Sequence, residues 1–364
     1  MSRPHSLRGF TLVETMIALV IVMVGFWAFY EVVVRTTDAN DYAMAFTSLA
    51  ATTQTVVNDI REDLSVGKLV FRNNTSGQGY LAAVTFPVQF PILGNSRLPG
   101  AREGGVFERD TGATNYTGNV LLFARTEQAY VGNLRYCNDL AKQRAVRVDL
   151  YRLVAYYLSK VPGAQIGGVR DSLNLIRASS PVYADYTQIT QIVDPVPAED
   201  PDLKMEVVKD LYNNYGIRYL WDTSANASAA FYAVTPGAGG TFQIAAAPDA
   251  GYRPPLSALN EYIRNLRFKH ASVSWNTGST FRTPVGCPAF GFANASGDGF
   301  PLGFEVQVIG VSGARQTLVC LTLARQTPAQ RIAAHRAQII ISSKDYFSAP
   351  ESPVFLPQRP ECRP

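Results

Sequence analysis

The stretch RGFTLVETMIALVIVMVGFWAFYEVVV, residues 8–34, decides the fold because it predicts a helix that is apolar enough to cross a membrane. Every residue at positions 16–30 is apolar or aromatic, and only two threonines and two glutamates interrupt residues 10–34. As a helix this segment would be roughly 37 Å long at about 1.5 Å per residue, enough to span a hydrocarbon core of about 30 Å. A carboxylate in hydrocarbon is costly, so Glu14 needs a partner.

The residues on either side of this run predict its orientation. The run is preceded by Arg3, His5 and Arg8. This positive charge predicts that the N-terminus lies in the cytoplasm and that the chain after Val34 lies on the other side of the membrane. A secretory signal would end in small residues of the A-x-A kind, and no such site follows Val34. We therefore do not expect cleavage after the run.

The segment RGFTLVE, residues 8–14, resembles the signal of type IV prepilins. In that family a basic leader ends in Gly, an aspartic prepilin peptidase cuts after it on the cytoplasmic face, and the new N-terminal Phe is N-methylated. The resemblance implies cleavage between Gly9 and Phe10. It also places the family's marker glutamate, fifth in the mature chain, on Glu14.

The resemblance supplies a partner for Glu14. Cleavage would leave a cationic amine on Phe10, and in a bundle of stacked helices Glu14 of one subunit can neutralise that amine on a neighbour, strongly so at low dielectric. Such a pair would set the axial register of one subunit against the next. The alternative is that Glu14 is a first-turn residue near the membrane interface, favoured by the helix dipole and solvated by headgroups.

The apolar pattern continues at helical spacing beyond the membrane as far as about Ser65. The residues that carry it are Tyr42, Phe46, Leu49, Val57, Ile60 and Leu64. The predicted organisation is a leader at residues 1–9, a transmembrane and assembly helix at 10–34, an amphipathic continuation of that helix at 35–66, and a β-rich globular head at 67–364.

Within the head, short runs rich in β-branched and aromatic residues alternate with Gly, Asn and Pro. The runs are residues 68–72, 80–86, 119–125, 145–158, 303–311, 316–324 and 337–343. They predict an antiparallel β-sheet packed on the C-terminal half of the long helix, an α+β fold. Irregular stretches at residues 87–118, 181–206 and 234–255 predict large loop insertions, and residues 258–268 predict a short helix or strand.

Two strand segments in the head carry a second resemblance. VAYYL at residues 154–158, followed by LNLIR at residues 173–177, is similar to a paired-strand pattern in PilW-type minor pilins and in the J-type pseudopilins of type II secretion. This resemblance implies a pilin-like fold and a structural role.

The overall charge does not predict a nucleic-acid partner. The net charge is +4, and a chain without Arg3 and Arg8 carries 31 basic and 29 acidic side chains, a net charge of +2. Basic and aromatic residues are interleaved at 218–221, 267–270 and 281–282, a combination that can bind single-stranded DNA. Exposed strand edges explain these residues better, and DNA contact is kept as the alternative.

The cysteines predict disulfides if the head is exported. Cys137, Cys287, Cys320 and Cys362 form an even set with no metal-binding spacing, and two disulfides would allow three pairings. Cys362 would most simply attach the tail at residues 351–364 to the sheet, with Cys287 and Cys320 as its candidate partners. Four buried free thiols would be the alternative for a cytosolic chain.

Signals for catalysis and metal binding are sparse. His270 and His335 are too far apart for a metal-binding pair, and no GxSxG, P-loop or HExxH motif occurs. The acidic residues Asp194, Glu199, Asp200 and Asp202 could bind Ca²⁺, as some pseudopilin heads do, but the prolines among them favour an extended, solvated loop. We expect no enzyme activity, no cofactor and no metal.

These observations predict a structural minor pilin that primes assembly of a type IV pilus or lies at its tip. The expected partners are other pilin and minor pilin subunits, the prepilin peptidase, the inner-membrane assembly platform and the membrane itself. The head would lie in the periplasm and, after assembly, in the extracellular pilus. The alternatives are a type II secretion pseudopilin and, in another class, a membrane-anchored periplasmic binding module or enzyme.

Overall fold

The computed structural model describes residues 11–92, 94, 96–103, 117–135, 143–166, 170–192, 203–258, 271–273, 304–326 and 332–343. Its helices are α1 (Leu12–Ser65), α2 (Thr75–Ala83), α3 (Tyr186–Thr190) and α4 (Leu203–Asn214), with 3-10 turns η1 (Ala227–Ala229) and η2 (Ala238–Gly240). Its strands are β1 (Gly67–Val70), β2 (Ala101–Arg102), β3 (Val120–Arg135), β4 (Gln143–Ile166), β5 (Arg170–Asp185), β6 (Tyr219–Trp221), β7 (Phe231–Pro236), β8 (Phe242–Ile244), β9 (Ser257–Ala258), β10 (Ala271–Val273), β11 (Phe304–Ile309), β12 (Arg315–Gln326) and β13 (Ile332–Ser343).

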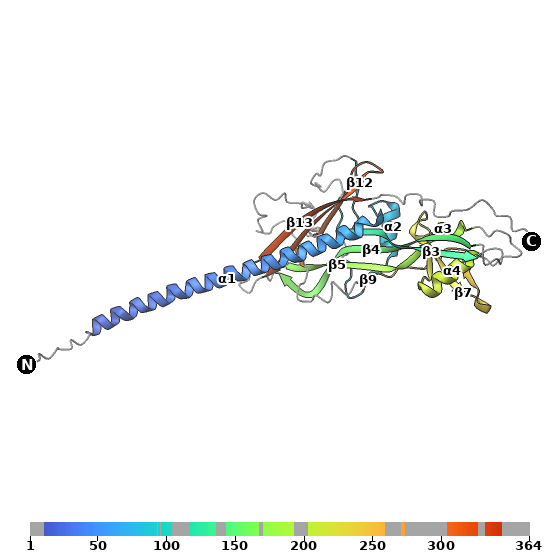
Figure 1. The fold of residues 1–364 in the computed structure, drawn as a ribbon. Coiled ribbons are helices and arrows are strands. Elements are labelled where there is room, and N and C mark those ends of the chain that lie inside the picture. The colour runs from blue at the N-terminus through green and yellow to red at the C-terminus, as the bar shows by residue number, and fades with distance from the viewer. Residues whose placement is uncertain are drawn as a thin grey trace, which may run out of the picture.

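Helix α1 projects far out of the rest of the molecule (Figure 1). Its 54 residues include no proline, the residue that would interrupt a continuous helix. The first buried side chain is Ala45, and the buried positions from there recur at helical spacing on one face: Ala45, Leu49, Thr53, Val56, Val57, Ile60, Asp63 and Leu64. The prediction of one long helix whose second half packs on the head is confirmed.

The strands form a mostly antiparallel sheet in the order β1-β3-β4-β5-β10-β12-β11-β2, with β13 paired to β12. The long pairs β3–β4 and β4–β5 make its centre. Among the described strands two pairs are parallel, β11 with β2 and β5 with β6, and the other pairs have the predicted antiparallel arrangement. The predicted α+β arrangement is confirmed.

The central strands are buried on both faces, as their alternating side chains show. On β3, Leu121 and Phe123 face α1, where they join a cluster with Val56 and Ile60. Leu122 points the other way, into a second cluster that α2 and β6 cover.

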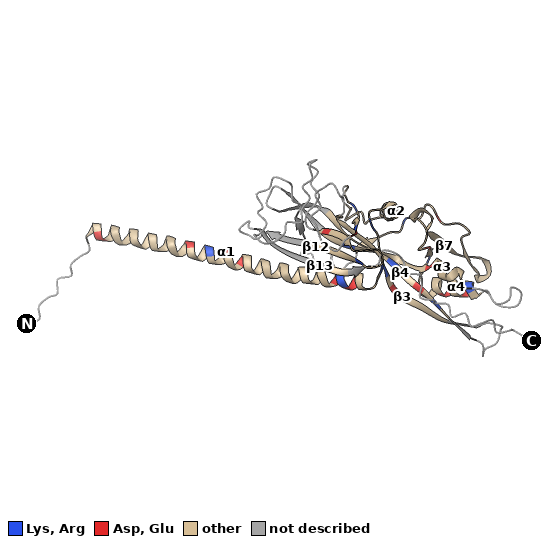
Figure 2. Ribbon diagram, turned by 90° about the horizontal axis from the view of Figure 1, so that it is seen from above, with Lys and Arg blue, Asp and Glu red and all other residues tan. Residues whose placement is uncertain are grey.

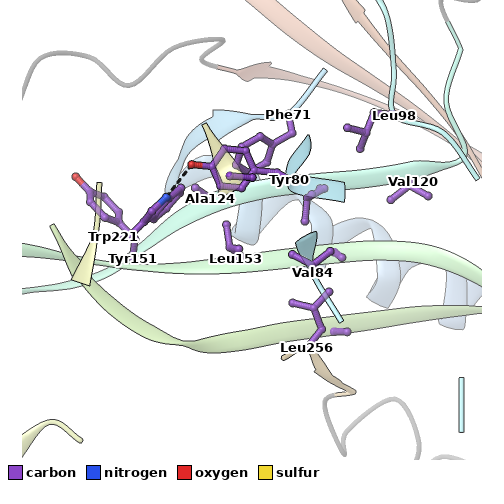
Figure 3. Packing of buried hydrophobic residues seen from close by; sticks show 14 of the residues in the cluster. Phe71, Tyr80, Val84, Leu98, Val120, Ala124, Tyr151, Leu153, Trp221 and Leu256 are labelled. Atoms are coloured by element: carbon purple, nitrogen blue, oxygen red, sulfur yellow. Dashed lines mark hydrogen bonds between the residues drawn. The ribbon is translucent and has the colours of Figure 1, made fainter. Parts of the chain in front are cut away.

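Figure 3 shows this second cluster, in which the indole Nε1 of Trp221 donates a hydrogen bond to the hydroxyl of Tyr80 at 3.0 Å. The central strands therefore make a rigid platform that carries α1 on one face and α2 on the other.

Helices α3 and α4 cover the far end of the sheet, away from the N-terminus of α1 (Figure 1). Ile189 of α3 and Val207 of α4 are fully buried with Val148 and Leu150 of β4 in a third apolar cluster. We call α3 and α4 together the α3–α4 cap. Their apolar side chains attach the cap to the end of the β3–β4 hairpin.

The sequence predicts a strand at residues 80–86, and this prediction is wrong. Residues 80–83 belong to α2, whose N-cap Asn74 accepts a hydrogen bond from the backbone N–H of Gly77 at 2.8 Å, and Thr85 beyond the helix makes only an isolated bridge to Pro255. Tyr80 lies in the core with its ring 4.6 Å from that of Phe71 and 5.9 Å from that of Trp221. The N-cap at Asn74 and the packing of Tyr80 in the core therefore outweigh the strand-like composition of this segment.

The prediction of an irregular segment at residues 181–206 is wrong in part. Strand β5 continues to Asp185, and α3 follows it directly. The turn into α3 is stabilised because the Asp185 carboxylate accepts the backbone N–H of Gln188 at 3.0 Å. The helix or strand predicted at 258–268 lies almost wholly outside the described residues.

Candidate assembly site

The first turn of α1 holds the Glu14 carboxylate against its own N-cap. One Glu14 oxygen accepts hydrogen bonds from the backbone N–H and the hydroxyl of Thr11, both at 2.9 Å, while the Thr11 hydroxyl accepts from the Glu14 N–H at 3.3 Å. This reciprocal arrangement is a capping box, which satisfies donors that a helix N-terminus leaves free. Within a single chain, Glu14 is therefore the first-turn member of a capping box with Thr11.

Pairing of Glu14 with the amine of a neighbouring subunit stays a prediction, since it needs a second chain. The predicted cleavage and methylation residues, Gly9 and Phe10, lie outside the described part of the chain. Thr11, the residue after them, already has the extended conformation of a helix N-cap.

The first half of α1 exposes a continuous apolar surface. Leu12 is 77% exposed, Phe26 71% and Trp27 68%. Helix α1 contains a window long and apolar enough to cross a membrane, and none of that window is buried against the head. Exposed apolar surface of this extent indicates contact with lipid or with other proteins. The helix fits a single-pass membrane anchor.

The next part of α1 carries charges whose partners lie on the helix itself. Figure 2 shows few charged residues between the first turn and the middle of α1, where Glu31 and Arg35 form an i,i+4 ion pair. The hydroxyls of Thr36 and Thr37 donate to the carbonyls of Val32 and Val33 at 2.7 and 2.9 Å. The two threonine hydroxyls at the end of the apolar segment are therefore bonded to the helix backbone.

The last turn of α1 ends in a buried ionic junction with the sheet. Asp63 is only 2% exposed. Its carboxylate accepts two hydrogen bonds from the Arg177 guanidinium on β5, at 2.7 and 2.8 Å, and one from the Tyr156 hydroxyl on β4 at 2.6 Å. Arg125 of β3 donates to the same carboxylate. One side chain of α1 therefore binds all three central strands.

The electrostatics of this junction favour the ionised carboxylate. Burial by itself would raise the pKa of Asp63, but hydrogen bonds from Arg177 and Tyr156 and the positive charges of Arg177 and Arg125 outweigh it, so the pKa lies below its usual range. The two arginines also offset the negative end of the helix dipole, for which the last turn of α1 itself has no basic residue.

A second row of charges borders the junction. Glu127 forms ion pairs with Arg152 and Arg125, whose Nε atoms lie 3.0 and 3.3 Å from its carboxylate. These side chains are 21–30% exposed, so solvent weakens their attraction compared with that at Asp63.

Sequence reasoning missed the Asp63 junction, although one signal was present. Asp63 follows Val56 by seven residues and Ile60 by three, which places it on the buried face of the helix. A carboxylate on that face requires buried donors.

The other predicted site residues are not brought together in the part of the chain that the structure describes. Cys320 is buried in β12, whereas Cys137, Cys287 and Cys362 lie outside the described residues, so the disulfides stay predictions. The calcium candidates Asp194, Glu199, Asp200 and Asp202 also lie outside them. Among the residues described, no group of three or more acidic, histidine or cysteine side chains could hold a metal ion.

Comparison with known protein families supports the N-terminal signal. The family model described as the prokaryotic N-terminal methylation motif matches residues 6–30. The chain therefore carries a type IV pilin-like prepilin signal, which supports a pilin-like or pseudopilin-like role with pilin-family proteins and prepilin peptidase as partners. Searches of curated proteins and of solved structures gave no match.

Proposed function

We propose that the protein is a structural minor pilin. In this proposal the prepilin peptidase cuts between Gly9 and Phe10. Before assembly the mature chain is anchored in the inner membrane with its head in the periplasm. It then packs its α1 against other subunits at or near the tip of a type IV pilus. It does no catalysis of its own.

The observation that carries this proposal is the exposed apolar half of α1 directly behind the methylation motif. Only the second half of the helix is attached to the head, so the first half is available to lipid before assembly and to neighbouring helices afterwards. Both environments have a low dielectric, in which Glu14 gains most from an amine partner.

The size of the head supports a position at the tip. Residues 67–364 would crowd a helical lattice in which every subunit is equivalent, whereas a tip position tolerates bulk. A type II secretion pseudopilin would use the same helix and signal, so the identity of the neighbouring subunits separates the two alternatives.

Photo-crosslinking from the exposed helix tests the proposal. A photoreactive amino acid at Phe26 should give cross-links to pilin or minor pilin subunits, while the same probe in a Gly9→Val chain, which cannot be cleaved, should lose them. Cross-links to secretion-system pseudopilins would favour that alternative. Cross-links that Gly9→Val leaves unchanged, or adducts to lipid alone, would favour a membrane-anchored binding module or enzyme.

A further inference from the structure

Two buried carboxylates meet where β5 ends and the α3–α4 cap begins. Asp149 on β4 is 7% exposed and Asp185 at the end of β5 is 4% exposed. They belong to neighbouring strands, because the next residues along each strand, Leu150 and Ala184, are direct partners in the β4–β5 ladder. The two acids thus lie side by side at the edge of the cap.

Gln188 of α3 joins the two acids and is itself fully buried. Its side-chain carbonyl accepts the backbone N–H of Asp149 at 2.6 Å, and its amide donates to the Asp149 carboxylate at 3.1 Å. Its backbone N–H donates to the Asp185 carboxylate at 3.0 Å. A single residue of the cap is thereby bound to both strands.

The positive charge that faces this pair among the described residues reaches Asp149 and not Asp185. On β4, the Tyr151 hydroxyl donates to the Asp149 carboxylate at 3.5 Å, and Arg147, whose side chain is 57% exposed, donates to it at 3.3 Å. From the turn after β6, Asp222 adds a further negative charge near Asp185. Among the described residues no arginine or lysine forms an ion pair with Asp185, in contrast to Asp63.

We propose that Asp149, Asp185 and Gln188 form a proton-dependent clasp, which holds the α3–α4 cap on the sheet in acidic surroundings and loosens it as the pH rises towards neutral. With one proton on the pair, a single negative charge remains, and the hydrogen bonds of Gln188 hold. When that proton leaves, two negative charges face each other in a site with little water. Opening the cap then hydrates both.

The titration of Asp185 falls in the range that such a clasp requires. Burial, and then the charges of Asp149 and Asp222, raise the pKa of Asp185 to about 6 against the opposing effect of the backbone N–H groups of Gln188 and Thr187. An opened cap would return Asp185 to an ordinary pKa of about 3.9. By linkage, the equilibrium constant for opening should rise about tenfold between pH 5 and pH 7.5.

This inference concerns the head alone and does not depend on the proposed assembly role. Amide hydrogen exchange of the full-length protein in detergent, followed by mass spectrometry at pH 5 and 7.5 and corrected for intrinsic rates, measures the opening. Peptides from α3 and α4 should lose about tenfold in protection at the higher pH. Peptides from residues 56–64 of α1 serve as the internal reference, and their protection should not change.

The variant Asp185→Asn keeps an N-cap and removes the titrating group, so its cap should be equally protected at both pH values. Asp249→Asn removes an exposed carboxylate and should behave as the wild type. Should Asp185→Asn not fold, Asp149→Asn gives the same test, because removal of the neighbouring charge should weaken the pH dependence. Equal protection of the wild-type cap at both pH values, or a dependence that survives these substitutions, would overturn the proposal.

Discussion

Two buried aspartates, one over the middle of the central strands and one where β5 ends, have opposite effects on the head. Asp63 accepts hydrogen bonds from two arginines and a tyrosine, whereas Asp185 is held by the backbone N–H groups of Gln188 and Thr187 and lies beside a second carboxylate. Both are almost inaccessible to solvent. The difference shows that the donors around a buried carboxylate, and not its burial, decide whether its charge stabilises the fold.

The same comparison separates two kinds of attachment. At Asp63 the charge is compensated, so α1 should stay fixed to the sheet at any pH at which the carboxylate is ionised. Asp185 has backbone N–H donors but no arginine or lysine partner among the described residues, so the α3–α4 cap is attached conditionally. The junction that attaches α1, the assembly helix, to the sheet is therefore the firmer of the two.

The largest expected effect is at the compensated site. Asp63→Asn would leave Arg125 and Arg177 partly buried without their counter-charge, and loss of one partner of such a pair costs about 3–5 kcal/mol. Urea unfolding of the full chain in detergent at pH 7 should show this loss, while Glu62→Gln, an exposed neighbour in the same turn, should change stability little. An Asp63→Asn chain as stable as the wild type would mean that the charge of Asp63 does not stabilise the fold.

The second-largest expected effect is at Asp185, where substitution should raise the stability of the head. Because the folded-state pKa of Asp185 is raised to about 6, its contribution is most favourable below the unfolded pKa and is lost as the pH rises through about 6. Asp185→Asn should therefore stabilise the head by up to about 3 kcal/mol at pH 7.5 and by little at pH 4. Thermal unfolding at the two pH values checks this, and a variant that is less stable than the wild type at pH 7.5 would contradict it.

The pH profile of the wild type sharpens the contrast. The pKa of Asp63 is lowered, so its contribution is present above the unfolded pKa of about 4 and is lost as the pH falls below it. Asp185 acts in the window from about 4 to 6 with the opposite slope. Stability should therefore fall below about pH 4 in the wild type, and this fall should be much smaller in Asp63→Asn. If Asp63→Asn leaves the loss of stability at low pH unchanged, other carboxylates cause that loss.

The smallest effect is expected in the partly exposed row beside the junction. Glu127→Gln weakens contacts to Arg125 and Arg152 that solvent already screens, so it should cost less than about 1 kcal/mol. The same urea unfolding measures it. A loss as large as that of Asp63→Asn would mean that the whole row acts as one buried network.

The sequence predicts those parts of the fold that are recorded locally. The apolar run at residues 8–34 and the spacing of Leu49, Val57, Ile60 and Leu64 predict α1. Runs of β-branched and aromatic residues predict parts of β3, β4 and β12. Helix α2 could not be predicted this way, because it contains Gly77 and Gly79 and depends on Tyr80 packing against distant aromatic residues.

The two aspartates show where sequence reasoning ends. Spacing places Asp63 on the buried face of α1, but its partners Arg125, Tyr156 and Arg177 are 62, 93 and 114 residues away in the chain. Only the register of three strands brings them to one point. The closeness of Asp149 and Asp185 likewise follows from the pairing of β4 with β5, to which residue types give no guide.

The most direct test of the assembly role is the mass of the mature N-terminal peptide from the native membrane, with and without the prepilin peptidase. The account predicts a chain that begins at N-methylated Phe10 and that keeps its leader when the peptidase is absent. An intact leader in the presence of the peptidase would contradict it and would leave the head as the place to look for a function.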